Sequence, residues 1–135
     1  MIPRASDTDR SLDLQRTEAL DAVDRLLAEA GAPGTPPLPG RYLVVAQDGR
    51  QRLVPLARPV THLGRGFAAT LQLEDPGVSR RHAIVVQRRG QVRILDDRSA
   101  NGTWVNGRRV FDEELRDGDV IVLGRAVLVF VDVSA

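Results

Sequence analysis

The spacing of hydrophobic residues changes once along the chain. Between Ser11 and Gly31 they recur at intervals of three and four, which is typical of an amphipathic helix. Ser11 is the predicted N-cap and Gly31 the predicted C-terminal stop. A helix of this length is marginal in isolation, so it docks on another element, dimerises or frays. The residues of the predicted apolar stripe are Leu12, Leu20, Val23, Leu26, Leu27 and Ala30.

A segment rich in Pro and Gly follows the helix. Residues 32–40 read A-P-G-T-P-P-L-P-G, a composition that fits neither a helix nor a central strand. We therefore predict three parts: an N-terminal tail and amphipathic helix (1–31), a linker (32–40) and a domain (41–135).

Within the domain the spacing becomes two and β-branched residues are frequent, which predicts short strands. Turn signals such as Asp48-Gly49, Asn106-Gly107 and Asp117-Gly118 separate them. Many short strands without intervening helices are typical of an all-β antiparallel sandwich or barrel. The predicted strands are Tyr42–Ala46, Gln51–Leu56, Val60–Leu63, Leu71–Leu73, Ala83–Gln87, Val92–Leu95, Thr103–Val105, Val120–Leu123 and Val127–Val131.

Composition narrows the function. The 135 residues contain no Cys and only two His, so we expect neither a disulfide nor a metal site, and no cofactor motif is present. No apolar run reaches the roughly 20 residues of a membrane helix, and no signal-peptide core is present, so the expected location is the cytoplasm, with no membrane partner. The net charge of +1 argues against a nucleic-acid partner. All basic residues are Arg, whose planar fork binds phosphate oxygens in pairs.

Polar groups cluster at the predicted strand ends between residues 63 and 107. Gly64-Arg65 ends one strand, Ser79 and Arg80 lie in the loop opened by Asp75-Pro76-Gly77, and Asn101 precedes another strand. Together they offer cations, a hydroxyl and an amide, which suit an oxyanion attached to a peptide. Ser79 and His82 lack an acidic partner and a nucleophile elbow, so we do not expect an enzyme.

The ordered set G-R, S-x-x-H, N-G-T-x-x-N-G and L-x-D-G-D-x-I-x-L-G resembles the forkhead-associated (FHA) domain, over about residues 40–133. The resemblance implies a β-sandwich that binds phosphothreonine. It also implies that Arg65 binds the phosphate oxygens, Ser79 donates to them, Arg80 supplements them and Asn101 bonds the ligand main chain. The resemblance further implies residues that shape the loops: Gly64, His82, Gly102, Thr103, Asn106 and Gly107.

We therefore predict a non-catalytic adaptor in Ser/Thr kinase signalling, whose partners are phosphothreonine-containing proteins such as the kinases or their substrates. The alternative is an assembly scaffold that acts independently of phosphate. Thr8, Thr17 and Thr35 are predicted phosphorylation positions in an acidic N-terminal part (residues 1–40, net −3) that precedes a basic domain (residues 41–135, net +4). A phosphorylated tail could fold back onto the site or bind that of a neighbour.

Overall fold

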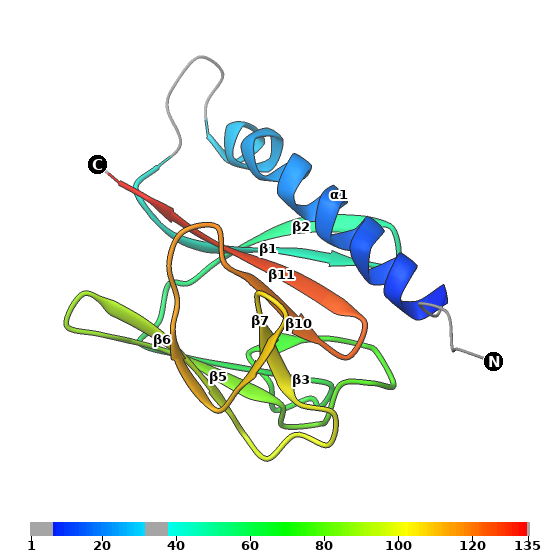
Figure 1. The fold of residues 1–135 in the computed structure, drawn as a ribbon. Coiled ribbons are helices and arrows are strands. Elements are labelled where there is room, and N and C mark those ends of the chain that lie inside the picture. Colours follow the sequence, from blue (N-terminus) through cyan, green and yellow to red (C-terminus); the bar gives the residue numbers. More distant parts are fainter. Residues whose placement is uncertain (1–6, 32–37, 135) are drawn as a thin grey trace.

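The computed structural model describes residues 7–31 and 38–134. Two sheets pack face to face, and one helix lies on the outer face of the first (Figure 1). The predicted sandwich with an N-terminal helix is confirmed. Sheet A has the order β2-β1-β11-β10-β7-β8 and sheet B the order β4-β3-β5-β6-β9. All described strand pairs are antiparallel except β3 with β4.

The strands are short, as the spacing of turn signals predicts. Sheet A consists of β1 (Gly40–Gln47), β2 (Arg50–Pro55), β7 (Thr103–Val105), β8 (Arg108–Val110), β10 (Val120–Leu123) and β11 (Ala126–Val133). Sheet B consists of β3 (Val60–Gly64), β4 (Leu71–Gln72), β5 (Ala83–Arg88), β6 (Gln91–Asp96) and β9 (Asp112–Glu114). The sequence pattern did not predict β8 and β9, because these are edge strands of three residues with mostly charged side chains.

The main apolar core fills the space between the sheets and includes Leu43, Leu63, Ile94, Leu128 and Phe130. A second apolar layer lies between sheet A and α1 (Asp7–Ala30). Strands β1 and β11 are therefore buried on both faces. Their near-continuous hydrophobic runs, rather than alternating ones, follow from this double burial.

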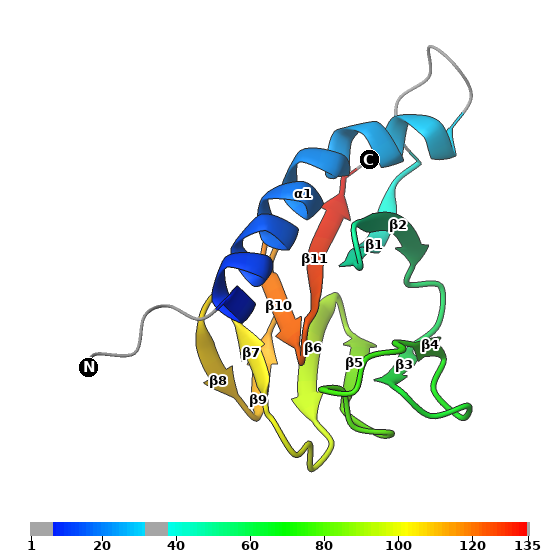
Figure 2. The same ribbon diagram turned by 90° about the vertical axis from the view of Figure 1, so that its right-hand side faces the viewer.

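Helix α1 docks along β1, β2 and β11 (Figure 2). Of the three alternatives predicted for the helix, docking, dimerisation or fraying, the structure shows docking. Its first residue is Asp7, so the prediction of Ser11 as N-cap is wrong. Four of the six residues of the predicted stripe pack against the sheet, namely Leu12, Val23, Leu26 and Leu27, whereas Leu20 is 44% exposed and Ala30 is exposed. Ala19 and Ala22 also lie against the sheet, because small side chains let the helix approach the strands closely.

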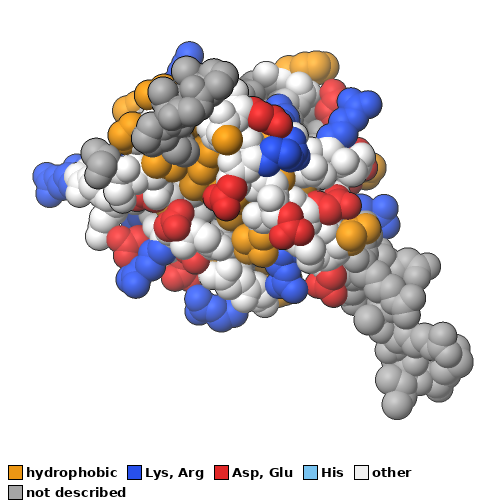
Figure 3. All heavy atoms as spheres, turned by 90° about the horizontal axis from the view of Figure 1, so that it is seen from above, with side chains coloured by type: hydrophobic (Ala, Val, Ile, Leu, Met, Phe, Trp, Pro, Cys, Tyr) orange, Lys and Arg blue, Asp and Glu red, His pale blue; other side chains and the backbone are white. Residues whose placement is uncertain are grey.

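The outer face of the helix is mostly polar but also exposes Leu14 and Leu20, and acidic and basic side chains are interspersed on the described part of that side of the molecule (Figure 3). Among the described residues, no helix has the length and apolar character needed to span a bilayer. The linker predicted at residues 32–40 lies largely outside the described residues, and the predicted part boundaries stay predictions.

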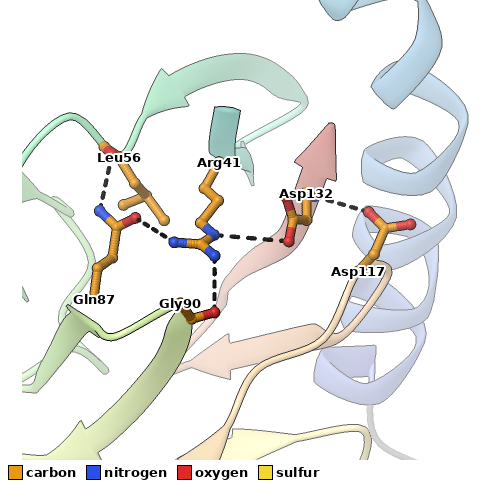
Figure 4. Close-up of polar contacts among 6 residues, drawn as sticks. All are labelled: Arg41, Leu56, Gln87, Gly90, Asp117 and Asp132. Carbon is orange, nitrogen blue, oxygen red and sulfur yellow. Dashed lines mark hydrogen bonds and ion pairs between the residues drawn. The ribbon is translucent and has the colours of Figure 1, made fainter. Parts of the chain in front are cut away.

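One end of the sandwich is tied together by Arg41 of β1 (Figure 4). Its guanidinium donates to the carbonyl of Gly90 in the β5–β6 turn at 2.9 Å and to Oε1 of Gln87 at 3.4 Å. Its Nε lies 3.7 Å from Oδ2 of Asp132 on β11. Arg41 thus joins the two sheets at the end where β5 finishes. The opposite end, where β3 and β6 finish and β5 begins, carries the predicted site (Figure 2).

Candidate functional site

Three loops meet at this end of the sandwich: β3–β4 (residues 65–70), β4–β5 (residues 73–82) and β6–β7 (residues 97–102). They carry Arg65, Ser79 with Arg80, and Asn101, respectively. The structure thus brings the four predicted phosphothreonine-binding residues to the same end of the fold, on loops that hydrogen bonds connect.

The first two loops are joined by their backbones. Arg65 N donates to the Ser79 carbonyl at 2.9 Å, and Gly66 N donates to the Arg80 carbonyl at 3.1 Å. Gly64 is required by this approach, because a Cβ atom there would lie 2.1 Å from the carbonyl oxygen of Arg80. The predicted loop-shaping role of Gly64 therefore has a steric basis.

The side chain of Arg65 is anchored at one atom only. Its Nε donates to the Val78 carbonyl at 3.0 Å, and no other side-chain bond from Arg65 is found among the described residues. Both terminal NH₂ groups of this exposed guanidinium are therefore available to a ligand. A guanidinium in that state binds two oxygens of one oxyanion.

Ser79 is oriented by the third loop. Its Oγ accepts a hydrogen bond from the Ala100 N–H at 2.9 Å. A hydroxyl has one proton to donate besides its two acceptor positions, so this contact leaves the Ser79 proton free for a ligand oxygen. The contact uses the backbone of Ala100, and it is formed although residue 100 has no polar side chain.

Asn101 forms a second hydrogen bond between the β6–β7 and β4–β5 loops. Its Nδ2 donates to the Gly77 carbonyl at 2.9 Å, while no bond to its Oδ1 is found in the described part of the chain. The exposed amide oxygen is thus an acceptor that suits a ligand N–H. The indole Nε1 of Trp104 donates to the Asn101 carbonyl at 3.1 Å and holds the backbone here.

His82 is fully buried and contacts both the β4–β5 loop and the β6–β7 loop. Its Nδ1 accepts from the Ser79 N–H at 3.0 Å, so in this neutral ring the proton lies on Nε2 and is donated to the Gly102 carbonyl 2.8 Å away. His82 therefore connects Ser79 to the residue after Asn101. It has no free nitrogen for catalysis.

The β6–β7 loop is shaped by a carboxylate that the sequence pattern did not single out. Asp96 accepts from the Ser99 N–H at 2.9 Å, from the Ser99 hydroxyl, and from the Thr103 hydroxyl at 2.7 Å. The Ser99 hydroxyl in turn accepts from the Gly102 N–H at 2.9 Å. An Asp followed by Ser three positions later is the available signal for such a turn.

Burial alone raises the pKa of the Asp96 carboxyl. The hydrogen bonds from Ser99 and Thr103 outweigh burial and hold that pKa below its ordinary value of 3.8. A carboxyl whose pKa is lower in the folded state stabilises the fold above the unfolded pKa and loses this effect as the pH falls through the folded value.

Asp96→Asn is therefore expected to lower the thermal unfolding midpoint at pH 7 by a few degrees. The difference from the wild type should narrow as the pH falls below about 4, because the wild-type carboxylate then takes up a proton. Thermal melts of both proteins from pH 7 to pH 3 measure this. A difference that stays constant over the whole range would contradict the assignment.

The remaining residues predicted to shape the loops lie in two places. Gly102, with φ +92°, and the buried Thr103 belong to the site. Asn106 and Gly107 form the β7–β8 turn at the other end of β7, where Asn106 Nδ2 donates to Asp119 at 2.9 Å.

Of the predicted phosphorylation positions, Thr17 lies on α1 with its hydroxyl bonded to the Asp13 carbonyl at 3.1 Å. The side chain of Thr8 and all of Thr35 lie outside the described residues.

Exposed cations lie at this end, together with the carboxylates of Glu74, Asp75, Asp96 and Asp97. Arg65, Arg80 and Arg98 are exposed, while Arg81 is paired with Asp97 at 3.2 Å. Arg80 also lines a hollow of about 250 Å³ beside Ala68 and Ala69. The described residues contain no group of three or more His, Cys, Asp or Glu able to hold a metal ion.

Comparison with known proteins identifies the family. The FHA domain model matches residues 61–124. The oxoglutarate dehydrogenase inhibitor of Corynebacterium diphtheriae is 36% identical over 105 residues, which cover 76% of this chain and 73% of that protein. The glycogen accumulation regulator GarA of Mycolicibacterium smegmatis is 36% identical over 115 residues, covering 82% and 72%, respectively. The chain belongs to the FHA family.

Two further similarities concern the domain alone. The FHA domain-containing protein FhaA of Mycobacterium tuberculosis is 43% identical over 83 residues, and this chain spans only 16% of its length. A solved structure from a study of phosphothreonine-dependent FHA domain interactions has a TM-score of 0.63 and 36% identity, and the match covers 67% of this chain and 94% of that one.

These findings confirm the predicted family. The two relatives matched over most of their length are named as a regulator and an inhibitor. The expectation that the chain is not an enzyme is confirmed by them.

Proposed function

We propose that this chain binds phosphothreonine peptides across the three loops and thereby recruits or regulates Ser/Thr kinases or their substrates in the cytoplasm. Arg65, Ser79 and Arg80 bind the phosphate, and Asn101 bonds the ligand main chain. The observation that carries the proposal is the anchoring of Arg65 through Nε alone, which leaves two donor groups for an oxyanion. The free proton of Ser79 supplies another donor.

The energetics suit a reversible adaptor. A phosphothreonine carries about −1.5 to −2 charge and three acceptor oxygens. Charge-assisted hydrogen bonds contribute about 1.5–3 kcal/mol each. After ordering costs, a few such bonds correspond to micromolar binding near about −8 kcal/mol. The net charge of +1 and the mixed charges of the face in Figure 3 do not favour a nucleic-acid partner.

The test is a titration of the full chain with a degenerate phosphothreonine peptide library and the same library without phosphate. We expect micromolar binding of the phosphorylated library only, and weaker binding by Ser79→Ala. Equal affinity for both libraries would reject the proposal and favour the phosphate-independent scaffold.

Phe67 lies beside this site and supports a preference for apolar ligand residues. Its side chain is 97% exposed, two positions after Arg65. The loop is held in place by Gly66 N bonded to the Arg80 carbonyl and by Ala69 N bonded to the Gly66 carbonyl, both at 3.1 Å. An aromatic side chain presented from an ordered loop contributes much of the energy of a protein contact.

Phe67→Ala is therefore expected to weaken the tightest phosphothreonine peptide by about 5- to 20-fold and to flatten the preference for apolar residues in the library. Phe111→Ala removes an aromatic side chain that is 68% exposed after β8 and serves as the matched control. Library binding by both variants measures the effect. Equal affinities of the two variants would exclude Phe67 from the ligand contact.

We also propose phosphorylation in the N-terminal part as a regulatory input. Because Thr17 lies within α1 with its hydroxyl hydrogen-bonded, it must leave the helix to present an extended strand to a site that pairs with ligand backbone. Thr8 also lies within α1 (Asp7–Ala30), so both threonines of the helix rank below Thr35. Kinase treatment followed by mass spectrometry and a repeat of the peptide titration decides which position, if any, blocks the site.

A further inference from the structure

The β10–β11 turn (residues 124–125) lies between helix α1 and the phosphate-binding end. On one side, Nε2 of Gln15 donates to the carbonyl of Arg125. On the other side, Arg125 N donates to Oδ2 of Asp75 at 2.7 Å. Gln15 and Asp75 are both only 7% exposed, so these bonds are shielded from water.

Asp75 opens the turn that supports the two main ligand contacts. Its carbonyl accepts from Val78 N at 2.9 Å. The Val78 carbonyl then accepts from Arg65 Nε, and the Gly77 carbonyl accepts from Asn101 Nδ2. The residues 75–78 thus orient both the guanidinium and the amide that face the ligand.

The β10–β11 turn and the turn at residues 75–78 are in close backbone contact. A Cβ atom on Gly124 would lie 2.5 Å from Asp75 Oδ2 and 2.6 Å from the carbonyl carbon of Gly77. A Cβ on Gly77 would lie 3.1 Å from the Cα of Gly124. Since backbone meets backbone here, a displacement of residues 124–125 displaces residues 75–78 as well.

We propose that Gln15 of α1 is a positioning residue of the phosphopeptide site, acting through Arg125 and Asp75 on the orientation of Arg65 and Asn101. The inference rests on the proposed roles of Arg65 and Asn101. The helix is then more than a cover for sheet A, because one of its buried polar side chains fixes the turn that supports the site. By linkage, a ligand that orders Arg65 also strengthens the docking of α1 by the same factor.

The test replaces Gln15 by Met in the full chain, which keeps the length of the side chain and removes its hydrogen bonds. Gln51→Met is the matched control, because Gln51 Nε2 bonds Glu18 of α1 at 3.3 Å without contacting the β10–β11 turn. Gln15→Glu keeps an oxygen to accept from Asp48 N, a bond of 3.1 Å in the wild type, and serves if the Met variant fails to fold.

Two quantities are measured. One is the affinity for the tightest phosphothreonine peptide from the degenerate library, expected to fall about fivefold in Gln15→Met and to change less than about twofold in Gln51→Met. The other is the solvent exchange of the Arg65 Nε proton by NMR in the free protein, expected to accelerate in Gln15→Met only. The second measurement needs no ligand, so it decides on the positioning role even if the wild type does not prefer phosphorylated peptide.

A double-mutant cycle with Asp75→Ala separates this connection from general loss of stability. Once Asp75 no longer holds Arg125, Gln15→Met should weaken binding by less than about 1.5-fold further. Asp75→Asn keeps an acceptor oxygen and should retain most of the affinity. The proposal is overturned if Gln15→Met leaves Arg65 exchange unchanged, if Gln51→Met has the same effect, or if the effects of Gln15→Met and Asp75→Ala add.

Discussion

Arg65→Ala is expected to weaken phosphothreonine peptide binding by at least about 100-fold, because it removes two charge-assisted hydrogen bonds of about 1.5–3 kcal/mol each. The fold should be unaffected, since the side chain is exposed and its bond is one Nε contact to the Val78 carbonyl. Arg65→Lys keeps the charge but loses both the anchor and the paired donors, so an intermediate loss of about tenfold is expected. Calorimetric titration with the phosphorylated and unphosphorylated peptides measures both effects.

The control for charge alone is Arg88→Ala. Arg88 is exposed at the end of β5, near the turn that Arg41 holds, and so lies at the opposite end of the sandwich. Removing this cation changes the net charge by the same amount and should alter the affinity by less than about twofold. If both variants lost affinity equally, long-range attraction rather than a specific contact would explain binding. No loss in Arg65→Ala would refute the assignment.

The strands that the sequence predicted have buried residues within their bounds, except β2, whose side chains are at most half-buried. β7 and β10 were predicted with their observed bounds, since Val and Leu positions mark them clearly. β8 and β9 were not predicted, because an edge strand of charged residues gains its stability from pairing with β7 or β6 rather than from its own composition. The strand propensity of a sequence mainly reflects the burial of its side chains, and β8 and β9 bury few of theirs.

The helix and most of its buried stripe were predicted, since Leu12, Val23, Leu26 and Leu27 all pack against sheet A. Ala19 and Ala22 were missed, because a stripe read from large apolar residues overlooks the small side chains at the closest approach to the sheet. Gln15 is buried on that same face and was not singled out. A buried polar residue is recognised only when its partners, here Arg125 and Asp48, are known.

The candidate site also has a part that the sequence predicts and a part that it does not. The residues that face the ligand carry side chains with recognisable chemistry, and their order in the chain made them predictable. Their supports are largely backbone groups, such as the Val78 and Gly77 carbonyls and the Ala100 N–H. Every residue carries such groups, so no sequence pattern distinguishes them. The absence of a polar side chain at residue 100 therefore leaves the Ser79 contact intact.

The buried polar residues of this end connect loops to each other, and His82 has the largest role among them. Its ring bonds one loop through Ser79 N and the other through the Gly102 carbonyl, and it is fully buried, so bulk water does not replace it in either bond. Leaving both groups without partners costs about 1–3 kcal/mol each. The cavity left by the ring adds to this cost.

His82→Ala is accordingly expected to lower the free energy of unfolding by about 3–5 kcal/mol and to weaken phosphopeptide binding as well, because the Ser79 loop loses its anchor. His62→Ala, at an exposed position on β3, should change stability by less than about 0.5 kcal/mol. Urea unfolding of both variants measures the difference. His82→Gln, which retains a donor and an acceptor, provides a folded variant if the alanine protein does not fold, and its stability should lie between the two. Equal stability of the two alanine variants would show that the buried ring is not what holds the Ser79 and Asn101 loops together.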